Sequence, residues 1–302
     1  MKNDKEKSRI LSKASHTALM AAIHRFMATK ETKKDFIGPD NLAYVFLPSK
    51  AKFFLSFAFF RRVFTNKLHK KVPGTYEYLT ARTKFFDEIF VRSIKEKTPQ
   101  IVFLGSGYDT RAIRFQHLTK ETIIYELDAL TTQKEKIKNL KKHKIPLPGN
   151  LVFVSINFNT DNLKRILLSA GYEPNKKTLF IWEGVTMYIN PRAVNETLSF
   201  IKNNSGEDST LVFDYFYESV INGTCTLYGA DKLAESASNL NEHFNFGIED
   251  GKAQEFLDKN GFDIIQHYAP KEFEEKYLMD GKGNLFGKMY GFAGHVYAKL
   301  KN

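Results

Sequence analysis

Two glycines follow an apolar run in the segment IVFLGSGYDTR, residues 101–111. Gly105 and Gly107 allow the backbone to approach a ligand where a side chain would collide, and Asp109 comes just before the start of a helix pattern. This is the arrangement of a nucleotide-binding turn after a first strand. The third glycine of the dinucleotide-binding pattern is missing, because Thr110 and Arg111 follow Asp109. Taken alone, the two glycines could equally form a simple turn.

Asp128 ends the next apolar run, TIIYELD, and stands 23 positions after Gly105. An acidic side chain at about this distance can accept hydrogen bonds from both hydroxyls of a ribose. The alternative is that Asp128 is the N-cap of the helix pattern that follows it. Together with the two glycines, Asp128 predicts an adenosine-binding site, without choosing between NAD and S-adenosylmethionine.

The third and fourth apolar runs also end in polar residues. After the third, the amide of Asn157 could reach an adenine amino group, and Phe158 could lie against the ring. The fourth ends in Glu183 and Gly184. A carboxylate after four apolar residues is costly to bury unpaired, so we predict that Glu183 is a site residue. It suits the amino group of a methionine moiety better than a nicotinamide, and a helix cap or salt bridge is the alternative.

Seven short apolar runs alternate with helix-like segments from about residue 100 onward. The first five have the pattern of strands buried between helical layers, which predicts a mostly parallel sheet with helices on both faces. The last two could form an antiparallel edge pair. The predicted fold class is therefore α/β with a seven-stranded sheet. The runs are 101–107, 122–128, 151–157, 178–184, 209–216, 261–269 and 292–300.

The first 80 residues carry helix patterns and no strand alternation. We predict a helical N-terminal cap or lid at 1–80 and a sheet domain at 81–302, with an insertion near 217–250. Ser15 is a candidate N-cap of the first helix.

Four phenylalanines of the N-terminal segment have helical spacing: Phe53, Phe57, Phe60 and Phe64. Such a face predicts a cap helix that buries its aromatic rings against the main domain. The alternative is a basic and aromatic helix that lies on a membrane surface.

The composition narrows the class of protein. The net charge of +11 belongs to the first 100 residues, which hold 21 Lys and Arg against 9 Asp and Glu, whereas the rest holds 24 against 25. The single cysteine, Cys225, excludes an internal disulfide and favours a reducing, cytoplasmic compartment. We find no signal-peptide pattern and no apolar run of about 18 residues.

Several segments together resemble a known family. In chain order they are SHTALMAAIHR, FIGPDNLAYVFL, ARTKFFDEIF, FLGSGYDTRAIRF, YELDALTTQKEKI, FNTDNL and LFIWEGVTMYINP. This series is similar to the leucine carboxyl methyltransferase family, and most similar to its bacterial branch of S-adenosylmethionine-dependent O-methyltransferases. The resemblance covers about residues 15–215. It implies a Rossmann-like class I methyltransferase fold and S-adenosylmethionine as cofactor.

The resemblance also assigns roles to individual residues. It makes Arg82 the partner of the cofactor's carboxylate, for which a guanidinium fork is well suited. An ion pair of Arg82 with Asp87 or Glu88 is the alternative. Arg25 resembles a basic position that closes over the same carboxylate.

The remaining cofactor-binding residues come from the strand ends. Gly105 and Gly107 would pass under the methionine part, Asp128 would hold the ribose, and Glu183 would line the amino-acid end. Asp109 is also predicted to bind the cofactor. Two departures stand out. The family usually has Asp-Leu where this chain has Asn157 and Phe158, and Asp-Pro where it has Pro39 and Asp40.

We therefore predict an enzyme that transfers a methyl group to an oxygen, carboxylate or hydroxyl, of a small-molecule or carrier-bound acceptor. A carboxylate acceptor needs no general base, whereas a phenol or alcohol does. His243 and His295 are candidate bases, but a lone histidine is more often structural, so no catalytic residue is assigned. No metal-ligand cluster is evident. The basic N-terminal third could attract an anionic or aromatic acceptor, or contact a membrane surface.

Three rival functions stay open. An NAD-dependent oxidoreductase is disfavoured by the missing third glycine and by the lack of a Tyr-x-x-x-Lys pattern. A nucleic-acid methyltransferase is disfavoured because Trp182-Glu-Gly-Val stands where base methyltransferases carry an Asn-Pro-Pro-Tyr type of element. A non-catalytic protein that binds an adenosyl cofactor would use the glycines and Asp128 equally well.

Overall fold

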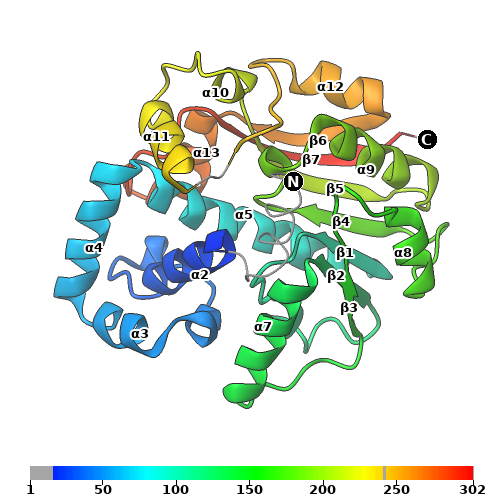
Figure 1. Ribbon diagram of the computed structural model, residues 1–302, viewed down its shortest axis with the longest axis horizontal. Helices are drawn as coiled ribbons and strands as arrows, with labels where there is room; N and C mark the ends of the chain where they lie inside the picture. The colour runs from blue at the N-terminus through cyan, green and yellow to red at the C-terminus, as the bar shows by residue number, and fades with distance from the viewer. Residues whose placement is uncertain (1–15, 241–242, 302) are drawn as a thin grey trace, which may run out of the picture.

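The computed structural model describes residues 16–240 and 243–301. Its centre is a seven-stranded sheet in the order β3-β2-β1-β4-β5-β7-β6 (Figure 1). Strands β1 to β5 are parallel to one another, whereas β7 runs antiparallel between β5 and β6. The predicted mostly parallel sheet is confirmed, and so is the antiparallel pair at its edge. The strands are β1 (Gln100–Leu104), β2 (Ile123–Asp128), β3 (Leu151–Ser155), β4 (Thr178–Trp182), β5 (Thr210–Phe216), β6 (Phe262–Tyr268) and β7 (Ala293–Leu300).

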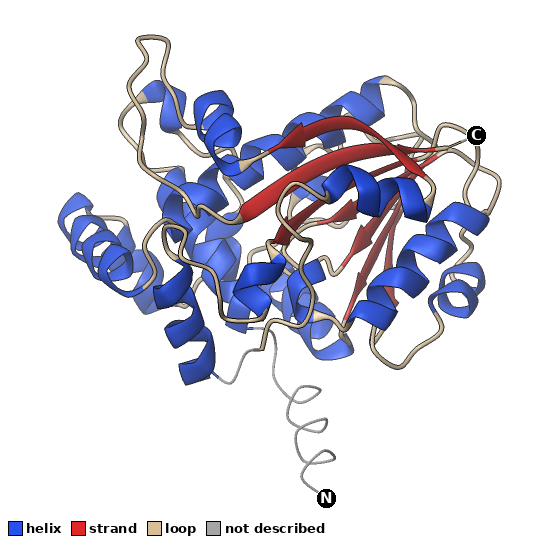
Figure 2. Ribbon diagram, turned by 90° about the horizontal axis from the view of Figure 1, so that it is seen from above, coloured by secondary structure: helices blue, strands red, loops and turns tan. Residues whose placement is uncertain are grey.

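The strand order reverses between β1 and β4. The chain builds outward from β1 through β2 to β3, and then returns to pair β4 with the other side of β1. In open α/β sheets a ligand crevice forms at such a switch point, at the carboxyl ends of the strands. Helices cover both sides of the sheet (Figure 2). They include α6 (Arg111–Arg114), α7 (Leu130–Lys142), α8 (Leu163–Ser169), α9 (Pro191–Asn203), α12 (Ala253–Asn260) and α13 (Pro270–Tyr277).

Local sequence signals fix the ends of several of these helices. The Asn190 side chain accepts the N–H of Ala193, and Pro191 is the first residue of α9. The Asn162 side chain does the same at the start of α8. Helix α12 ends at Gly261, which has a φ of 85° that favours glycine.

Helix α5 (Thr75–Lys95) connects the N-terminal segment to the sheet. Its apolar face, which includes Phe85, Phe86 and Phe90, is fully buried in the main core. The helix also packs against β4 and α13. The division into two parts at residue 80 stays a prediction, and α5 runs without interruption through that position.

A second, smaller core holds the N-terminal elements on the sheet domain. The predicted first helix is present as α2 (His16–Ala28), while Ser15 lies outside the described residues. Helix α2 packs on a 3₁₀ helix (Ala43–Phe46), and the ring of Phe46 stacks on that of Tyr108 with 4.6 Å between centroids. Since Tyr108 follows Gly107, the N-terminal elements rest directly on the glycine turn.

The prediction that one helix buries the four spaced phenylalanines is wrong. The segment forms two helices, α3 (Ser49–Leu55) and α4 (Ala58–Lys71), because Phe57 adopts an extended backbone conformation between them. Phe53, Phe57 and Phe60 are 61%, 49% and 40% exposed, and only Phe64 packs in part against the smaller core. The break turns the first three rings away from the protein body.

The described part of the segment predicted as an insertion, 217–250 without 241–242, contains two helices. They are α10 (Glu218–Ile221) and α11 (Ala230–Leu240). Ile248 returns to the sheet through a parallel bridge to Tyr217, so the segment begins and ends at the carboxyl end of β5.

Gly294 gives a test of the packing of β7 on β5. A Cβ added at this position would lie 2.3 Å from the ring of Tyr215 on the adjacent strand. We expect Gly294→Ala to lower the free energy of unfolding by about 1–3 kcal/mol, because the ring has to move out of a packed core. Urea denaturation measures this change. The control is Gly149→Ala, where an added Cβ would meet nothing within 4 Å. Equal stabilities of the two variants would contradict the predicted packing.

Candidate functional site

The glycine turn and Asp128 are joined by hydrogen bonds. Gly105 has a φ of 84°, and an added Cβ there would lie 2.5 Å from Val185. Gly107 donates its N–H to the Asp128 carboxylate at 2.6 Å, and Ala129 donates to the other carboxylate oxygen at 2.7 Å. Burial raises the pKa of Asp128, while the two N–H groups oppose this shift. The prediction that these residues meet at one strand edge fits this geometry.

The alternative role of Asp128 as an N-cap is wrong. Helix α7 begins at Leu130, its N-cap is Ala129, and no side chain caps it. A carboxylate has about four lone-pair positions. Backbone N–H groups of Gly107 and Ala129 each fill one of them, and the hydroxyl of Thr132 also donates to this carboxylate. The carboxylate therefore keeps acceptor capacity for the hydroxyls of a ligand.

Asn157 and Phe158 follow β3 at the same edge of the sheet. The register pairs Asp128 with Ser155, which places Asn157 two residues beyond the strand end. The side-chain oxygen of Asn157 accepts a hydrogen bond from the backbone N–H of Asn159 at 3.1 Å. The backbone N–H of Asn157 donates to the Asp161 carboxylate. Phe158 is half-buried against the main core. Their contact with an adenine stays a prediction.

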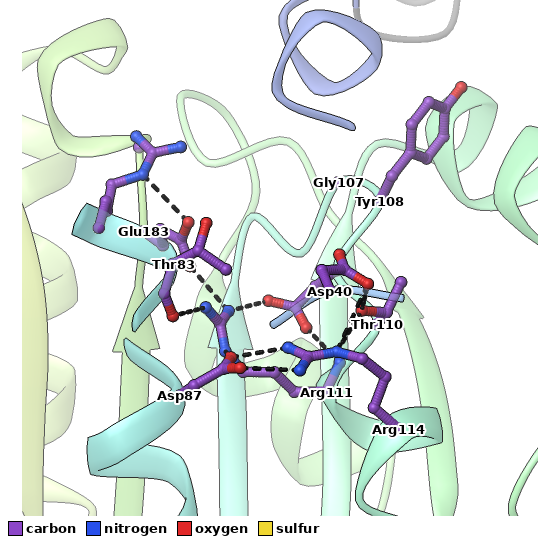
Figure 3. Close-up of polar contacts among 12 residues, drawn as sticks. Asp40, Thr83, Asp87, Gly107, Tyr108, Thr110, Arg111, Arg114 and Glu183 are labelled. Carbon is purple, nitrogen blue, oxygen red and sulfur yellow. Dashed lines mark hydrogen bonds and ion pairs between the residues drawn. The ribbon is translucent and has the colours of Figure 1, made fainter. Parts of the chain in front are cut away.

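Arg111 is the centre of a buried arginine network (Figure 3). Its guanidinium donates to Asp87 at 2.8 Å and to Glu183 at 2.7 Å, and it also contacts Asp109. The Arg111 side chain is only 3% exposed. Arg114 joins the network through two hydrogen bonds of 2.7 Å to Asp87. Asp109 is thus turned toward Arg111, and its predicted role in binding a cofactor stays untested by this geometry.

Arg82 belongs to the same network. Its Nε lies 3.0 Å from Glu183, and its terminal nitrogen lies 3.2 Å from Asp214. The hydroxyl of Tyr78 contacts both Arg82 and Asp214. The alternative ion pair of Arg82 with Asp87 or Glu88 is wrong.

Glu183 has the salt-bridge role that the sequence left open. Its two carboxylate oxygens bind Arg82 and Arg111. Burial by itself would raise the pKa of Glu183, but Arg111, Arg82 and Arg25 together lower it to about 2. The carboxylate is therefore ionised at neutral pH. Whether it also binds an amino group of a ligand stays a prediction.

Arg25 lies between the N-terminal segment and the glycine turn. It donates to the backbone oxygen of Tyr108 at 2.7 Å and pairs with Asp40 at 2.9 Å. Asp40 also accepts a hydrogen bond from the hydroxyl of Thr110. The reversed pair Pro39 and Asp40 thus supplies a carboxylate that ties α2 to the residues after Gly107.

A cavity of about 420 Å³ opens next to Arg82 and Gly184. We call it the aromatic cavity, because five Phe and Tyr side chains line it. Its lining comes from α2, α4, α5, α11 and the strand ends, and includes Tyr78, Tyr188, Phe216, Phe244 and Tyr290. Lys71 and Arg82 are charged members of this lining, which contains no Asp or Glu among the described residues.

His24 lines the aromatic cavity and is 2% exposed. Its Nδ1 lies 2.6 Å from the backbone oxygen of Met20, which makes Nδ1 the protonated nitrogen. Nε2 has no hydrogen-bond partner in the described part of the chain. Burial lowers the pKa of His24 to about 4, so the ring is neutral at neutral pH and presents a free lone pair.

The two histidines considered from the sequence lie elsewhere. His243 is exposed, and His295 is buried on β7 with its ring stacked on Phe273. Neither belongs to the lining of the aromatic cavity. His295 therefore has the structural role that is common for a lone histidine. Among the described residues, no group of three His, Cys, Asp or Glu side chains could hold a metal ion.

Comparison with known proteins places this arrangement in a family. The family model for leucine carboxyl methyltransferase matches residues 18–202. The chain belongs to the leucine carboxyl methyltransferase family. The match contains the glycine turn, Asp128, Glu183 and Arg82, so the site that the sequence predicted lies within the shared part.

Similar proteins carry names of the same class. The Bacillus subtilis protein YktD is provisionally named an S-adenosyl-L-methionine-dependent methyltransferase, and is 25% identical over 68% of this chain and 67% of its own length. A Mycobacterium tuberculosis protein with the same provisional name is 32% identical, but the match spans 42% of this chain and 40% of the relative. Without regard to the acceptor, the chain is an S-adenosylmethionine-dependent methyltransferase.

Solved structures show the fold. A Thermobifida fusca protein, provisionally described as a methyltransferase, has a TM-score of 0.54 and 14% identity over 80% of this chain and 89% of its own. The Rossmann-like class I methyltransferase fold is therefore confirmed. The family also decides against the NAD-dependent oxidoreductase, because the cofactor of this class is S-adenosylmethionine.

Sequence reasoning missed Asp214 and His24. Asp214 interrupts the apolar run of β5, and a charge in such a run was a signal that it has a buried partner. His24 shares a helical face with Thr17, Met20 and Ala21, all of which line the aromatic cavity. That spacing was visible in the sequence, but which side of α2 faces a cavity was not.

Arg111 gives a test of the network. We expect Arg111→Met to lower the free energy of unfolding by about 3–5 kcal/mol, because three buried carboxylates lose their shared cation. Arg192→Met is the control, since Arg192 pairs with Glu196 on the surface at 86% exposure. It should cost less than about 1 kcal/mol. Urea denaturation at neutral pH compares the two variants, and a similar small loss in both would contradict a structural network.

Proposed function

We propose that this protein transfers a methyl group from S-adenosylmethionine to a carboxylate oxygen of a small acceptor with an apolar or aromatic body. The observation that carries the proposal is the position of the aromatic cavity. It shares Arg82 and Gly184 with the strand edge where Asp128 and the glycine turn lie. Donor and acceptor sites would thus meet at the end of β4.

The residues at the strand edge fit the donor chemically. Asp128 keeps acceptor capacity for a ribose hydroxyl, and the glycine turn keeps side chains away from the backbone. The buried arginine network holds four guanidinium groups and five carboxylates, which leaves an excess negative charge for a cationic ligand. Its members are Arg25, Arg82, Arg111, Arg114, Asp40, Asp87, Asp109, Glu183 and Asp214. When bound, S-adenosylmethionine supplies an electrophilic methyl group on a positively charged sulfur.

The aromatic cavity favours an anionic acceptor over a neutral one. Lys71 brings a positive charge to the lining, which contains no Asp or Glu among the described residues, while Arg82 is already paired with Glu183 and Asp214. The aromatic walls exclude water from the acceptor and align it for an in-line transfer. A carboxylate arrives ionised, so the protein would have no proton to remove.

His24 is the group that would serve a hydroxyl acceptor. Its free Nε2 could accept the proton of a phenol or alcohol. With a pKa of about 4, however, His24 is a weak base for this task. This mismatch supports the carboxylate over the hydroxyl. For a carboxylate acceptor, His24 would instead contribute shape and apolar surface.

Calorimetric titration tests the donor site. We expect S-adenosylmethionine and S-adenosylhomocysteine to bind with micromolar affinity and NAD not to bind. Asp128→Ala should weaken binding by about 10- to 100-fold, because the ribose hydroxyls lose a charged hydrogen-bond acceptor worth ~1.5–3 kcal/mol. Asp263→Ala, which removes an exposed carboxylate on β6, is the control and should bind as the wild type does. Binding of NAD, or of none of the three compounds, would refute the proposal.

Activity measurements with matched acceptors test the acceptor class. We expect turnover of a phenyl-substituted short carboxylic acid and little turnover of a phenol of the same size. His24→Gln should change the rate with the acid by less than about threefold. If a hydroxyl is the true acceptor, the same variant would lose about 100-fold, and the wild-type rate would fall as the pH approaches 4, where His24 gains a proton. That second pattern would overturn the choice of a carboxylate.

A further inference from the structure

An exposed aromatic surface lies where α3 meets α4. We call it the aromatic tip, and it consists of Phe53, Phe54, Phe57, Phe59 and Phe60, which are 40% to 70% exposed. The rings contact one another, with centroids 5.0 to 6.3 Å apart. A contiguous apolar patch of this kind on a protein surface usually marks an interaction site.

The side chain of Arg61 fixes the turn between α3 and α4, where the aromatic tip lies. Arg61 donates to the backbone oxygens of Leu55 and Ser56 at 3.1 and 2.9 Å. Leu55 is buried, and Phe64 and Leu68 on the inner side of α4 pack against the smaller core. The segment α3–α4, which carries the five rings, lies at the rim of the molecule (Figure 1).

Positive charge surrounds the aromatic tip. Residues 41–76 contain no Asp or Glu. They contain seven basic residues, Lys50, Lys52, Arg61, Arg62, Lys67, Lys70 and Lys71. Arg62, Lys67 and Lys70 are exposed along α4, on the same helix as Phe59 and Phe60. Exposed aromatic rings next to basic side chains are complementary to a partner with an anionic outer layer and an apolar layer below it.

We propose that the aromatic tip docks this protein on an anionic lipid bilayer. The phenylalanines would enter the boundary between headgroups and acyl chains, while the lysines and arginines bind lipid phosphates. Among the described residues, no helix is long and apolar enough to cross a bilayer, so the contact is with one face of the membrane. The proposal is independent of the methyl acceptor.

Charge decides against a second copy of the chain as the occupant. An isologous contact would bring the basic residues of one copy against those of the other, without an acidic residue of segment 41–76 to pair with them. An anionic bilayer offers negative charge over its whole surface.

The position of α4 connects the two surfaces of the protein. Phe59 and Phe60 lie near the start of α4, and Leu68 and Lys71 near its end line the aromatic cavity. The docking surface and the cavity therefore share one helix.

Vesicle co-sedimentation tests the proposal with the full chain. We expect binding to vesicles of phosphatidylcholine mixed with phosphatidylglycerol, and weak binding to phosphatidylcholine alone. The triple variant Phe53→Ser, Phe57→Ser, Phe59→Ser should bind roughly 100-fold more weakly. The variant Arg62→Gln, Lys67→Gln, Lys70→Gln should also lose about 100-fold, from about fivefold for each cation.

A matched control removes exposed apolar side chains elsewhere. Leu147→Ser, Leu168→Ser, Ile265→Ser changes residues that are 37%, 38% and 45% exposed, and it should bind vesicles as the wild type does. Phe59→Trp should show a blue shift of its fluorescence when anionic vesicles are added, because the ring enters the bilayer. Equal losses in the control and the phenylalanine variant would overturn the proposal. The proposal would also be overturned if the wild type does not bind vesicles but forms a concentration-dependent dimer that the phenylalanine variant abolishes. Binding of single-stranded nucleic acid with the same dependence, again without vesicle binding, would overturn it as well.

Discussion

The pairing of buried arginines with buried carboxylates is the constraint on which this structure depends. Arg82 on α5 and Arg111 after β1 both hold Glu183 after β4, and Arg82 also holds Asp214 on β5. Burying any one of these charges alone would be strongly unfavourable. The helix and the three strand ends are therefore fixed relative to one another, and this fixed edge is where Asp128 and the glycine turn stand.

Much of the fold could be predicted, because strands buried on both faces appear in the sequence as short continuous apolar runs. The seven apolar runs correspond to seven strands, and the two glycines and Asp128 mark the ends of β1 and β2. Partners within the network could not be predicted in the same way. Arg82 and Asp214 are 132 positions apart, and local spacing does not show which acid a buried arginine selects. The alternative that paired Arg82 with Asp87 or Glu88 was wrong for that reason.

The aromatic helix shows a different limit. Helical spacing of Phe53, Phe57 and Phe60 indicates a common face only if the helix is continuous, and here it breaks at Phe57. Spacing also does not say whether an apolar face finds a partner within the chain. The absence of acidic residues from 41 to 76 was the better signal, since a segment whose charges are all basic is poorly suited to cover a largely neutral protein body.

The lining of the aromatic cavity comes from different parts of the chain. Arg82 and Gly184 belong to the charged network and the strand edge, whereas half of the remaining lining residues come from α2, α4 and α11. Substitutions in those peripheral helices can reshape the space around an acceptor and leave the charged edge intact. Evolution, or an engineer, could therefore change what the protein modifies one wall residue at a time, without rebuilding the part that handles the methyl donor.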